Sequence, residues 1–250
     1  MDRKIVLTFC EQLRQARENA IRDSEAFDEI IHVVERLGSF LCERIGDLGK
    51  YREHVVEKGR LSALAEDVPD RWRGIHIPFS LLYDLVRNAR NDALHQGAFA
   101  RRLTGHAIEL SLVLEDALRR SLDSPVVGDY MVRNPVCAEL WQPISFIRQQ
   151  MLANSFSFLP VKSAGGDWCL VSDLDIATYL GADASTRKAR LAKSLKAAEI
   201  PLQLAGSCAI DTPLEDAVRM LGRDKRLLLV YCQEQDERPL VGIVTAFDLI

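Results

Sequence analysis

The stretch V-S-D-L-D-I at residues 171–176 and the stretch G-I-V-T-A-F-D-L at residues 242–249 decide how the second half of this chain folds. In both, an apolar run is followed by a hydroxyl residue and, three positions later, by an aspartate. Upstream, Pro143-Ile144 matches Pro213-Leu214 in the same order. Such a repeat predicts two copies that pack on each other with pseudo-twofold symmetry, because neither copy alone could bury its sheet face.

Each copy has the pattern of a β-α-β-β unit. Short runs of β-branched, aliphatic and aromatic residues predict strands at 156–161, 168–171, 227–231 and 240–244. Helical patterns at 143–153 and 213–221 each open with a proline, which favours the first helical position. Hairpin turns are expected at Gly165-Gly166 and at residues 233–238.

Together with V-G-D-Y-M-V-R-N-P-V at residues 127–136, these motifs resemble a tandem CBS repeat, with copies at about 126–183 and 200–250. Such pairs usually sense adenine nucleosides or nucleotides in the clefts between the copies. The resemblance therefore implies AMP, ADP or ATP as a regulatory ligand. The nucleotide-binding residues that it implies are Ser172 with Asp175 and Thr245 with Asp248 for the ribose, and Phe158, Val161 and Val244 for the base.

The residue types suit that role. A hydroxyl at the end of a strand can bind a ribose or phosphate, and an aspartate at the next helix start can accept two ribose hydroxyls. The same spacing also caps a helix without any ligand. Two features depart from the family pattern. Cys169 stands where the second copy has Gly242, which crowds the backbone. The family's closing helix is missing after Asp248, so we expect the Thr245/Asp248 cleft to lack one wall.

The first half of the chain has helical periodicity. Apolar residues recur every three to four positions across residues 27–45, 79–94 and 98–122, whereas 61–78 is expected to be an irregular loop. We predict an α+β fold: an all-α helical bundle at 1–122, followed by a tandem α/β repeat module at 126–250.

The segment V-R-N-A-R-N-D-A-L-H-Q-G at residues 86–97 carries the compact chemical motif of this half. It resembles the Arg-x(4–6)-His motif of HEPN domains, which are helical bundles that often cleave RNA without a metal. The resemblance implies Arg90, Asn91 and His95 as catalytic residues, and a homodimer that presents two copies of the motif to one RNA. The expected phosphate contacts are Arg87, Arg101, Arg102 and His106.

Histidine can shuttle a proton near neutral pH, and a guanidinium can bind a phosphate through two hydrogen bonds. The alternative for the same arginines is an ion-paired helix face, in which Asp84 or Asp92 binds one of them.

The composition sets further bounds. A net charge of −4 argues against an indiscriminate binder of polyanions. The apolar runs are too short for a membrane span or a secretory signal, so we expect a cytoplasmic protein. The six cysteines stand singly and are expected to be reduced, without a zinc site.

We therefore expect an adenine-nucleotide-sensing protein that requires no cofactor and whose helical half is a candidate metal-independent endoribonuclease or RNA-binding dimer. The alternative is a non-catalytic nucleotide sensor whose helical half serves dimerisation or partner docking. A scaffold with two vestigial sites is the third possibility.

Overall fold

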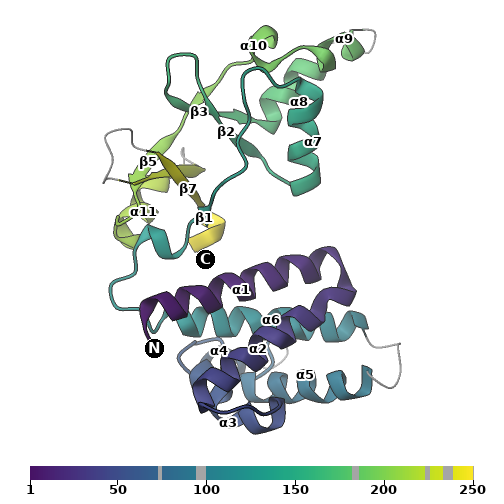
Figure 1. The fold of residues 1–250 in the computed structure, drawn as a ribbon, viewed down its shortest axis with the longest axis vertical. Helices are drawn as coiled ribbons and strands as arrows, with labels where there is room; N and C mark the ends of the chain where they lie inside the picture. Colours follow the sequence, from purple (N-terminus) through teal and green to yellow (C-terminus); the bar gives the residue numbers. More distant parts are fainter. Residues whose placement is uncertain (73–74, 94–99, 182–185, 223–225, 233–238, 250) are drawn as a thin grey trace. The chain divides into compact units, whose positions relative to one another are not determined.

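The computed structural model describes residues 1–72, 75–93, 100–181, 186–222, 226–232 and 239–249, and for residues 91–93 and 100–102 it describes the backbone alone. The chain forms two compact units, Met1–Pro125 and Val126–Ile250 (Figure 1). We call them the helical unit and the repeat unit.

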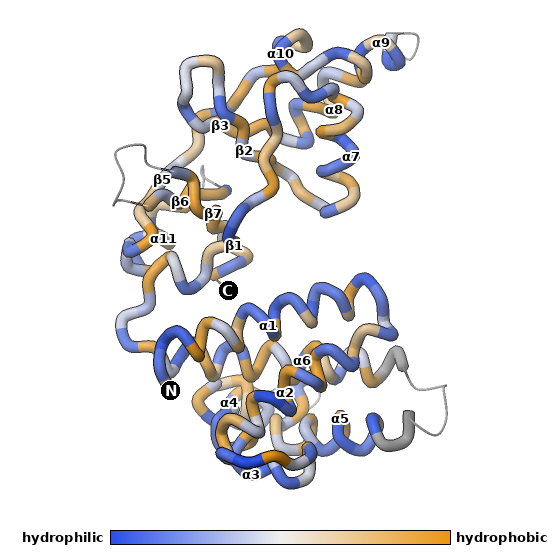
Figure 2. The backbone as a smooth tube through the Cα atoms, viewed as in Figure 1, coloured by the Kyte–Doolittle hydropathy of each residue, from blue (hydrophilic) through white to orange (hydrophobic). Residues whose placement is uncertain are grey.

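The helical unit is built from amphipathic helices, and both hydrophobic and hydrophilic residues occur along each of them (Figure 2). Its elements are α1 (Arg3–Arg22), η1 (Ser24–Ala26), α2 (Phe27–Cys42), α3 (Leu48–Gly59), α4 (Asp67–Arg71), α5 (Phe79–Ala93) and α6 (Ala100–Arg119). Helix α1 packs against α2 and α6, while α5 packs against α3 and α6. These contacts enclose one hydrophobic core.

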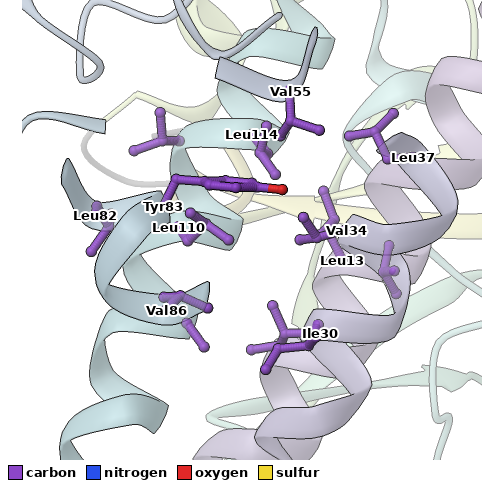
Figure 3. Close-up of a cluster of buried hydrophobic side chains, with 14 of the residues drawn as sticks. Leu13, Ile30, Val34, Leu37, Val55, Leu82, Tyr83, Val86, Leu110 and Leu114 are labelled. Carbon is purple, nitrogen blue, oxygen red and sulfur yellow. The ribbon is translucent and has the colours of Figure 1, made fainter. Parts of the chain in front are cut away.

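Tyr83 of α5 lies inside this core, among leucine, isoleucine and valine side chains from α1, α2, α3 and α6 (Figure 3). Its hydroxyl donates a 2.8 Å hydrogen bond to the carbonyl of Leu48, so the buried polar group is satisfied. Two helical glycines allow rings to approach closely. A Cβ at Gly38 would lie 2.5 Å from Cγ of Tyr51, and one at Gly59 would lie 2.4 Å from Cε1 of Phe79.

Three details of this half differ from the sequence prediction. The helix expected over 27–45 ends at Cys42, because Glu43 adopts a left-handed backbone with φ of 52°. The loop expected over 61–78 contains the short helix α4. Helices α1 and α3 were not assigned from the sequence at all.

The repeat unit contains the expected β-α-β-β order. Its elements are η2 (Val127–Asp129), β1 (Val132–Arg133), α7 (Ile144–Asn154), β2 (Phe158–Lys162), β3 (Trp168–Ser172), α8 (Asp173–Gly181), α9 (Arg187–Ala192), α10 (Leu195–Ala198), β4 (Gln203–Leu204), β5 (Gly206–Ala209), α11 (Leu214–Leu221), β6 (Leu227–Tyr231), β7 (Leu240–Thr245) and η3 (Ala246–Leu249). The four predicted strands correspond to β2, β3, β6 and β7. Helices α7 and α11 each begin one residue later than predicted, so Pro143 and Pro213 are their N-cap residues and not their first helical residues.

The strands form two sheets, with orders β2-β3-β4 and β1-β7-β6-β5. Strands β2 and β3 are antiparallel, and Gly166 at their turn has φ of +93°. The second predicted turn, 233–238, lies outside the described residues. In the other sheet, β5 runs parallel to β6, and β7 is antiparallel to both β6 and β1.

Each sheet is completed by a strand from the other copy, an arrangement that we call the strand exchange. Strand β1 of the first copy pairs with β7 of the second, through Val132 opposite Ile243. Strand β4, at the start of the second copy, pairs with β3 of the first, through Gln203 opposite Leu170. Two backbone hydrogen bonds repeat this relation, from Val127 to Thr212 and from Leu195 to Gln142.

A small apolar layer lies between the two sheets. Leu170 of β3 packs there with Leu227 and Leu229 of β6, and Trp168, Tyr231 and other partly buried side chains surround them. The two copies therefore share buried surface, as the repeat in the sequence predicts.

Within the described residues, no helix combines the length and apolar character needed to cross a bilayer. All six cysteines belong to the described part of the chain, and each is a free thiol.

Candidate functional site

A cavity of about 280 Å³ lies between the two copies of the repeat unit. The first copy contributes the start of β2, the end of β3 and the start of α8, whereas the second contributes β4, the residues up to Gly206 and the start of β6. The lining residues are Phe158, Leu170, Ser172, Asp173, Leu174, Gln203, Leu204, Ala205, Gly206, Arg226 and Leu227. Because both copies form the walls, a molecule bound here would contact both.

Three polar side chains, Ser172, Asp175 and Gln203, form what we call the polar cluster. The hydroxyl of Ser172 donates to Oδ2 of Asp175 at 2.5 Å and accepts from the Asp175 amide at 3.1 Å. Nε2 of Gln203 donates to the same Oδ2 at 2.7 Å and lies 3.4 Å from the Ser172 oxygen. Ser172 and Asp175 thus form the expected hydroxyl–carboxylate pair, and they also cap the start of α8.

The wall of the cavity beside this cluster is apolar. Phe158, predicted to contact a base, lines it together with Leu170 and Leu227. These two leucines were not predicted as site residues, because they belong to different copies and only the packing of the sheets brings them together. Arg226, also missed, is an exposed residue that lines the cavity just before β6 and places a cation there.

The structure corrects the expectation for Val161. Its side chain has no exposed surface and packs in the core between the first sheet and its helices. Val244 is likewise fully buried, in the core of the second copy. Both valines occupy strand positions whose side chains point away from the cleft, because successive strand residues face opposite sides of a sheet. Neither can contact a base in this conformation.

Thr245 and Asp248 repeat the pairing of Ser172 and Asp175. Both the amide and the hydroxyl of Thr245 donate to Oδ2 of Asp248 at 2.8 Å. The residues around this second pair differ from those around the first. Leu227 stands opposite Thr245 where Phe158 stands opposite Ser172. Val132 of β1 occupies the position that Gln203 of β4 has in the first copy.

Gly242 and Cys169, which are equivalent in the repeat, occupy equivalent places in the strand exchange. Gly242 pairs with Arg133 of β1, and Cys169 pairs with Leu204 of β4. A Cβ at Gly242 would lie 2.6 Å from Sδ of Met131 and 2.8 Å from the carbonyl oxygen of Val132. The second copy therefore requires glycine, whereas the first accommodates a buried cysteine.

Arg90 of the expected ribonuclease motif lies near the end of α5. Arg90 forms a 2.6 Å ion pair between its Nη1 and Oε1 of Glu35 on α2. This contact connects α5 to α2 and occupies part of the guanidinium that RNA cleavage would require. The side chains of Asn91, Arg101 and Arg102, and the whole of His95, lie outside the described residues. His106 is half-buried on α6.

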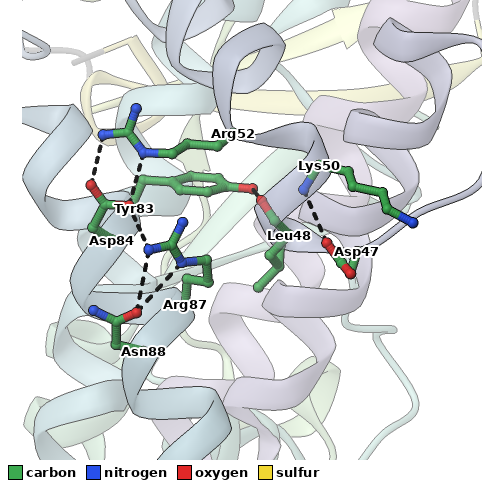
Figure 4. A network of polar contacts seen from close by, with 8 residues as sticks. All are labelled: Asp47, Leu48, Lys50, Arg52, Tyr83, Asp84, Arg87 and Asn88. Carbon is green, nitrogen blue, oxygen red and sulfur yellow. Dashed lines mark hydrogen bonds and ion pairs between the residues drawn. The ribbon is translucent and has the colours of Figure 1, made fainter.

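Arg87 belongs to an ion-paired helix face, which is the alternative that the sequence left open (Figure 4). Its Nη2 lies 3.3 Å from Oδ1 of Asp84. Arg52 of α3 binds the same carboxylate through two hydrogen bonds, of 2.8 and 2.6 Å. The hydrogen bonds from Arg52 lower the pKa of Asp84 below its ordinary value, against a smaller opposing effect of burial. Arg87 is therefore partly neutralised by a carboxylate.

Comparison with known proteins bears on the repeat unit. Residues 206–250, which run from β5 to the end of the chain, match the family model of the CBS domain. This match confirms the family resemblance for the second copy. It covers less than half of the chain. A search of curated proteins finds no match.

Solved structures also align with part of the chain. The acetoin utilization protein AcuB from Vibrio cholerae is 21% identical over 50% of this chain and 87% of its own, with a TM-score of 0.41. CBSX2, solved in complex with AMP, is 22% identical over 50% and 92%, with a TM-score of 0.39. The CBS domain pair of protein MJ0100, solved with 5′-methylthioadenosine and S-adenosyl-L-methionine, is 22% identical over 51% and 94%, with a TM-score of 0.39.

Proposed function

We propose that the repeat unit is a regulatory module that binds an adenosine-containing nucleotide in the cavity between its copies. The observation that carries the proposal is the Ser172–Asp175 pair at the edge of a cavity built from both copies. The volume of about 280 Å³ is near the lower end for small-molecule sites, which suits a mononucleotide.

Each part of such a ligand has a suitable partner. The apolar wall of Phe158, Leu170 and Leu227 can cover a base. Asp175 can accept hydrogen bonds from ribose hydroxyls, as a carboxylate with several lone pairs. The guanidinium of Arg226 can bind a phosphate. The resemblance to CBS repeats implies the ribose role of Asp175 and the base role of Phe158, whereas the roles of Arg226 and the two leucines rest on the cavity.

A ligand in this position would stabilise one arrangement of the two copies. Regulation then requires that the ligand bind two states of the protein with different affinity, because equal affinity shifts no equilibrium. The contribution of both copies to the walls provides a route to such a difference.

The test is calorimetric titration of the full chain with AMP, ADP, ATP and S-adenosylmethionine. We expect at least one of them to bind, and Asp175→Ala and Arg226→Ala to weaken binding about tenfold or more, as is usual when a hydrogen bond to a charged group is removed. Asp167→Asn, in the exposed β2–β3 turn, is the matched control and should bind like the wild type. Absence of heat and of any thermal shift with all four compounds at millimolar concentration would overturn the proposal.

RNA cleavage by the helical unit stays a prediction from the sequence, as does the homodimer that would bring two copies of His95 together. It is tested by incubating the full chain with RNA in the presence of a chelator. We expect cleavage that is lost in His95→Ala and Arg90→Ala. Because Arg90 also pairs with Glu35, Glu35→Gln is the control that breaks the ion pair and keeps the arginine. Equal cleavage by wild type and all variants would identify a contaminating nuclease, and no cleavage would leave the helical unit with a dimerisation or docking role.

A further inference from the structure

The carboxylate of Asp175 already accepts two hydrogen bonds on one of its oxygens. Oδ2 receives the hydroxyl of Ser172 at 2.5 Å and the amide of Gln203 at 2.7 Å. A carboxylate oxygen offers about two lone pairs, so these two donors occupy the acceptor capacity of Oδ2. A second ribose hydroxyl could bind at this oxygen only after one donor leaves.

Gln203 is the donor that can leave. The Ser172 hydroxyl is buried, and its residue lies next to Asp175 in the same cap. Gln203 is an exposed residue that reaches Asp175 from the other copy. Ser172 and Gln203 line the cavity, whereas Asp175 is not among the described residues that do so. A ligand hydroxyl that binds at Oδ2 therefore has to replace the Gln203 amide there.

The equivalent contact differs in the other copy. Gln203 stands opposite Leu170 in the register of β4 with β3, and Val132 stands opposite Ile243 in the register of β1 with β7. A valine side chain has no donor. Asp248 accordingly accepts from the amide and the hydroxyl of Thr245, both within its own cap. The other copy thus has valine, which lacks the competing amide, at the position equivalent to Gln203.

We propose that Gln203 determines the selectivity of the cleft by competing with a ligand hydroxyl for Oδ2 of Asp175. The wild-type cleft then gains little from the second hydroxyl of a ribose, because binding it costs the Gln203 hydrogen bond. The inference rests on the proposed nucleotide site, and it adds a specificity-determining residue to that site.

The test replaces Gln203 with the residue of the other copy. Gln203→Val is expected to fold, because the position is exposed and valine suits a strand. Calorimetry of the full chain compares AMP with 2′,3′-dideoxy-AMP. We expect Gln203→Val to bind AMP about threefold to tenfold more tightly than the wild type, the range that one net hydrogen bond supplies, and to bind the dideoxy compound unchanged. Gln149→Val, an exposed glutamine on α7, is the matched control and should change neither affinity.

The outcomes separate this inference from the proposal on which it rests. Equal or weaker binding of AMP to Gln203→Val, or an equal gain for both compounds, would overturn the role of Gln203 and leave the nucleotide site in place. Absence of AMP binding to both proteins would overturn this site for AMP, and the inference with it.

Discussion

Glu115 on α6 lies in a buried cluster of arginines within the helical unit. Its side chain is only 6% exposed and contacts Arg17 at 2.5 Å, Arg119 at 2.7 Å and Arg14 at 3.9 Å. Arg14 and Arg17 belong to α1, so the carboxylate connects the two helices. Charges in such a place are tolerated only when they are paired, because burial removes their hydration.

Glu115→Ala should therefore destabilise the helical unit by about 3–5 kcal/mol, the range for removing one partner of a buried ion pair. Urea unfolding of the full chain, followed by circular dichroism, measures the change. The control is Glu57→Ala, which breaks an exposed pair with Arg60 and should cost less than about 1 kcal/mol. Equal effects of the two substitutions would contradict the importance of burial at Glu115.

Cys10 and Tyr83 make the helical unit sensitive to alkaline pH. Burial raises the pKa of Cys10 from its ordinary value of 9.0 to about 12, and burial also raises the pKa of Tyr83. In the unfolded chain these groups lose their protons at lower pH than in the folded chain. Their contribution to stability is therefore complete below about pH 9 and is lost as pH rises toward 12.

We predict that the free energy of unfolding falls between pH 9 and 12, with a slope of up to about 1.4 kcal/mol per pH unit for each group. Urea unfolding at a series of pH values measures the slope. Cys10→Ala should reduce it, because alanine has no thiol to ionise. An unchanged slope in this variant would show that Cys10 does not contribute.

Gly242 determines how closely strand β1 approaches strand β7. Any side chain at this position would collide with Met131 and with the carbonyl of Val132. Gly242→Ala should therefore cost about 1–3 kcal/mol, as overpacking usually does. Gly105 of α6 is the control, because a Cβ there meets nothing within 4 Å. Gly105→Ala should stabilise the protein by up to about 1 kcal/mol. Thermal unfolding of both variants measures the signs, and a stabilising Gly242→Ala would contradict the close approach.

Strands with continuous apolar runs were predicted from the sequence, whereas some helices were missed. The strands β6 and β7 are continuous apolar runs, and they were located closely. Helix α1 also had a usable signal that was missed, because its buried residues Val6, Cys10, Leu13, Ala16 and Ala20 recur at helical spacing. Helix α3 had a usable signal, since Asp47 caps it and accepts from the Lys50 amide at 2.9 Å.

The part of the candidate site that depends on local sequence could be predicted. Ser172 and Asp175 are three residues apart, so local sequence determines their contact. Gln203 reaches them through a pairing of β4 with β3 that crosses the two copies, and the sequence carries no local sign of it. Val161 was misassigned because an apolar strand residue looks the same whether it faces a cleft or a core.

Each of the two units has its own hydrophobic core. Among the residues that the structure describes, the helical unit has one large cluster, and the repeat unit has a cluster for each copy and a third between the sheets. Units with separate cores can unfold separately.

Calorimetric melting of the full chain should therefore show two transitions. AMP at a hundred times its dissociation constant should stabilise the repeat unit by about 2.7 kcal/mol and raise only that transition. Glu115→Ala serves as the assignment control, because it should lower only the transition of the helical unit. A single transition that responds to both changes would show that the two units unfold together.

The strand exchange has a consequence for anyone who cuts this chain into pieces. Cleavage of the chain within residues 182–185 would give one fragment that contains β1 without β7 and another that contains β4 without β3. Each fragment would expose unsatisfied backbone groups along a bare sheet edge, and such edges adhere to one another. The two halves should thus recombine when mixed, as complementary fragments do, and each alone should precipitate or form swapped oligomers.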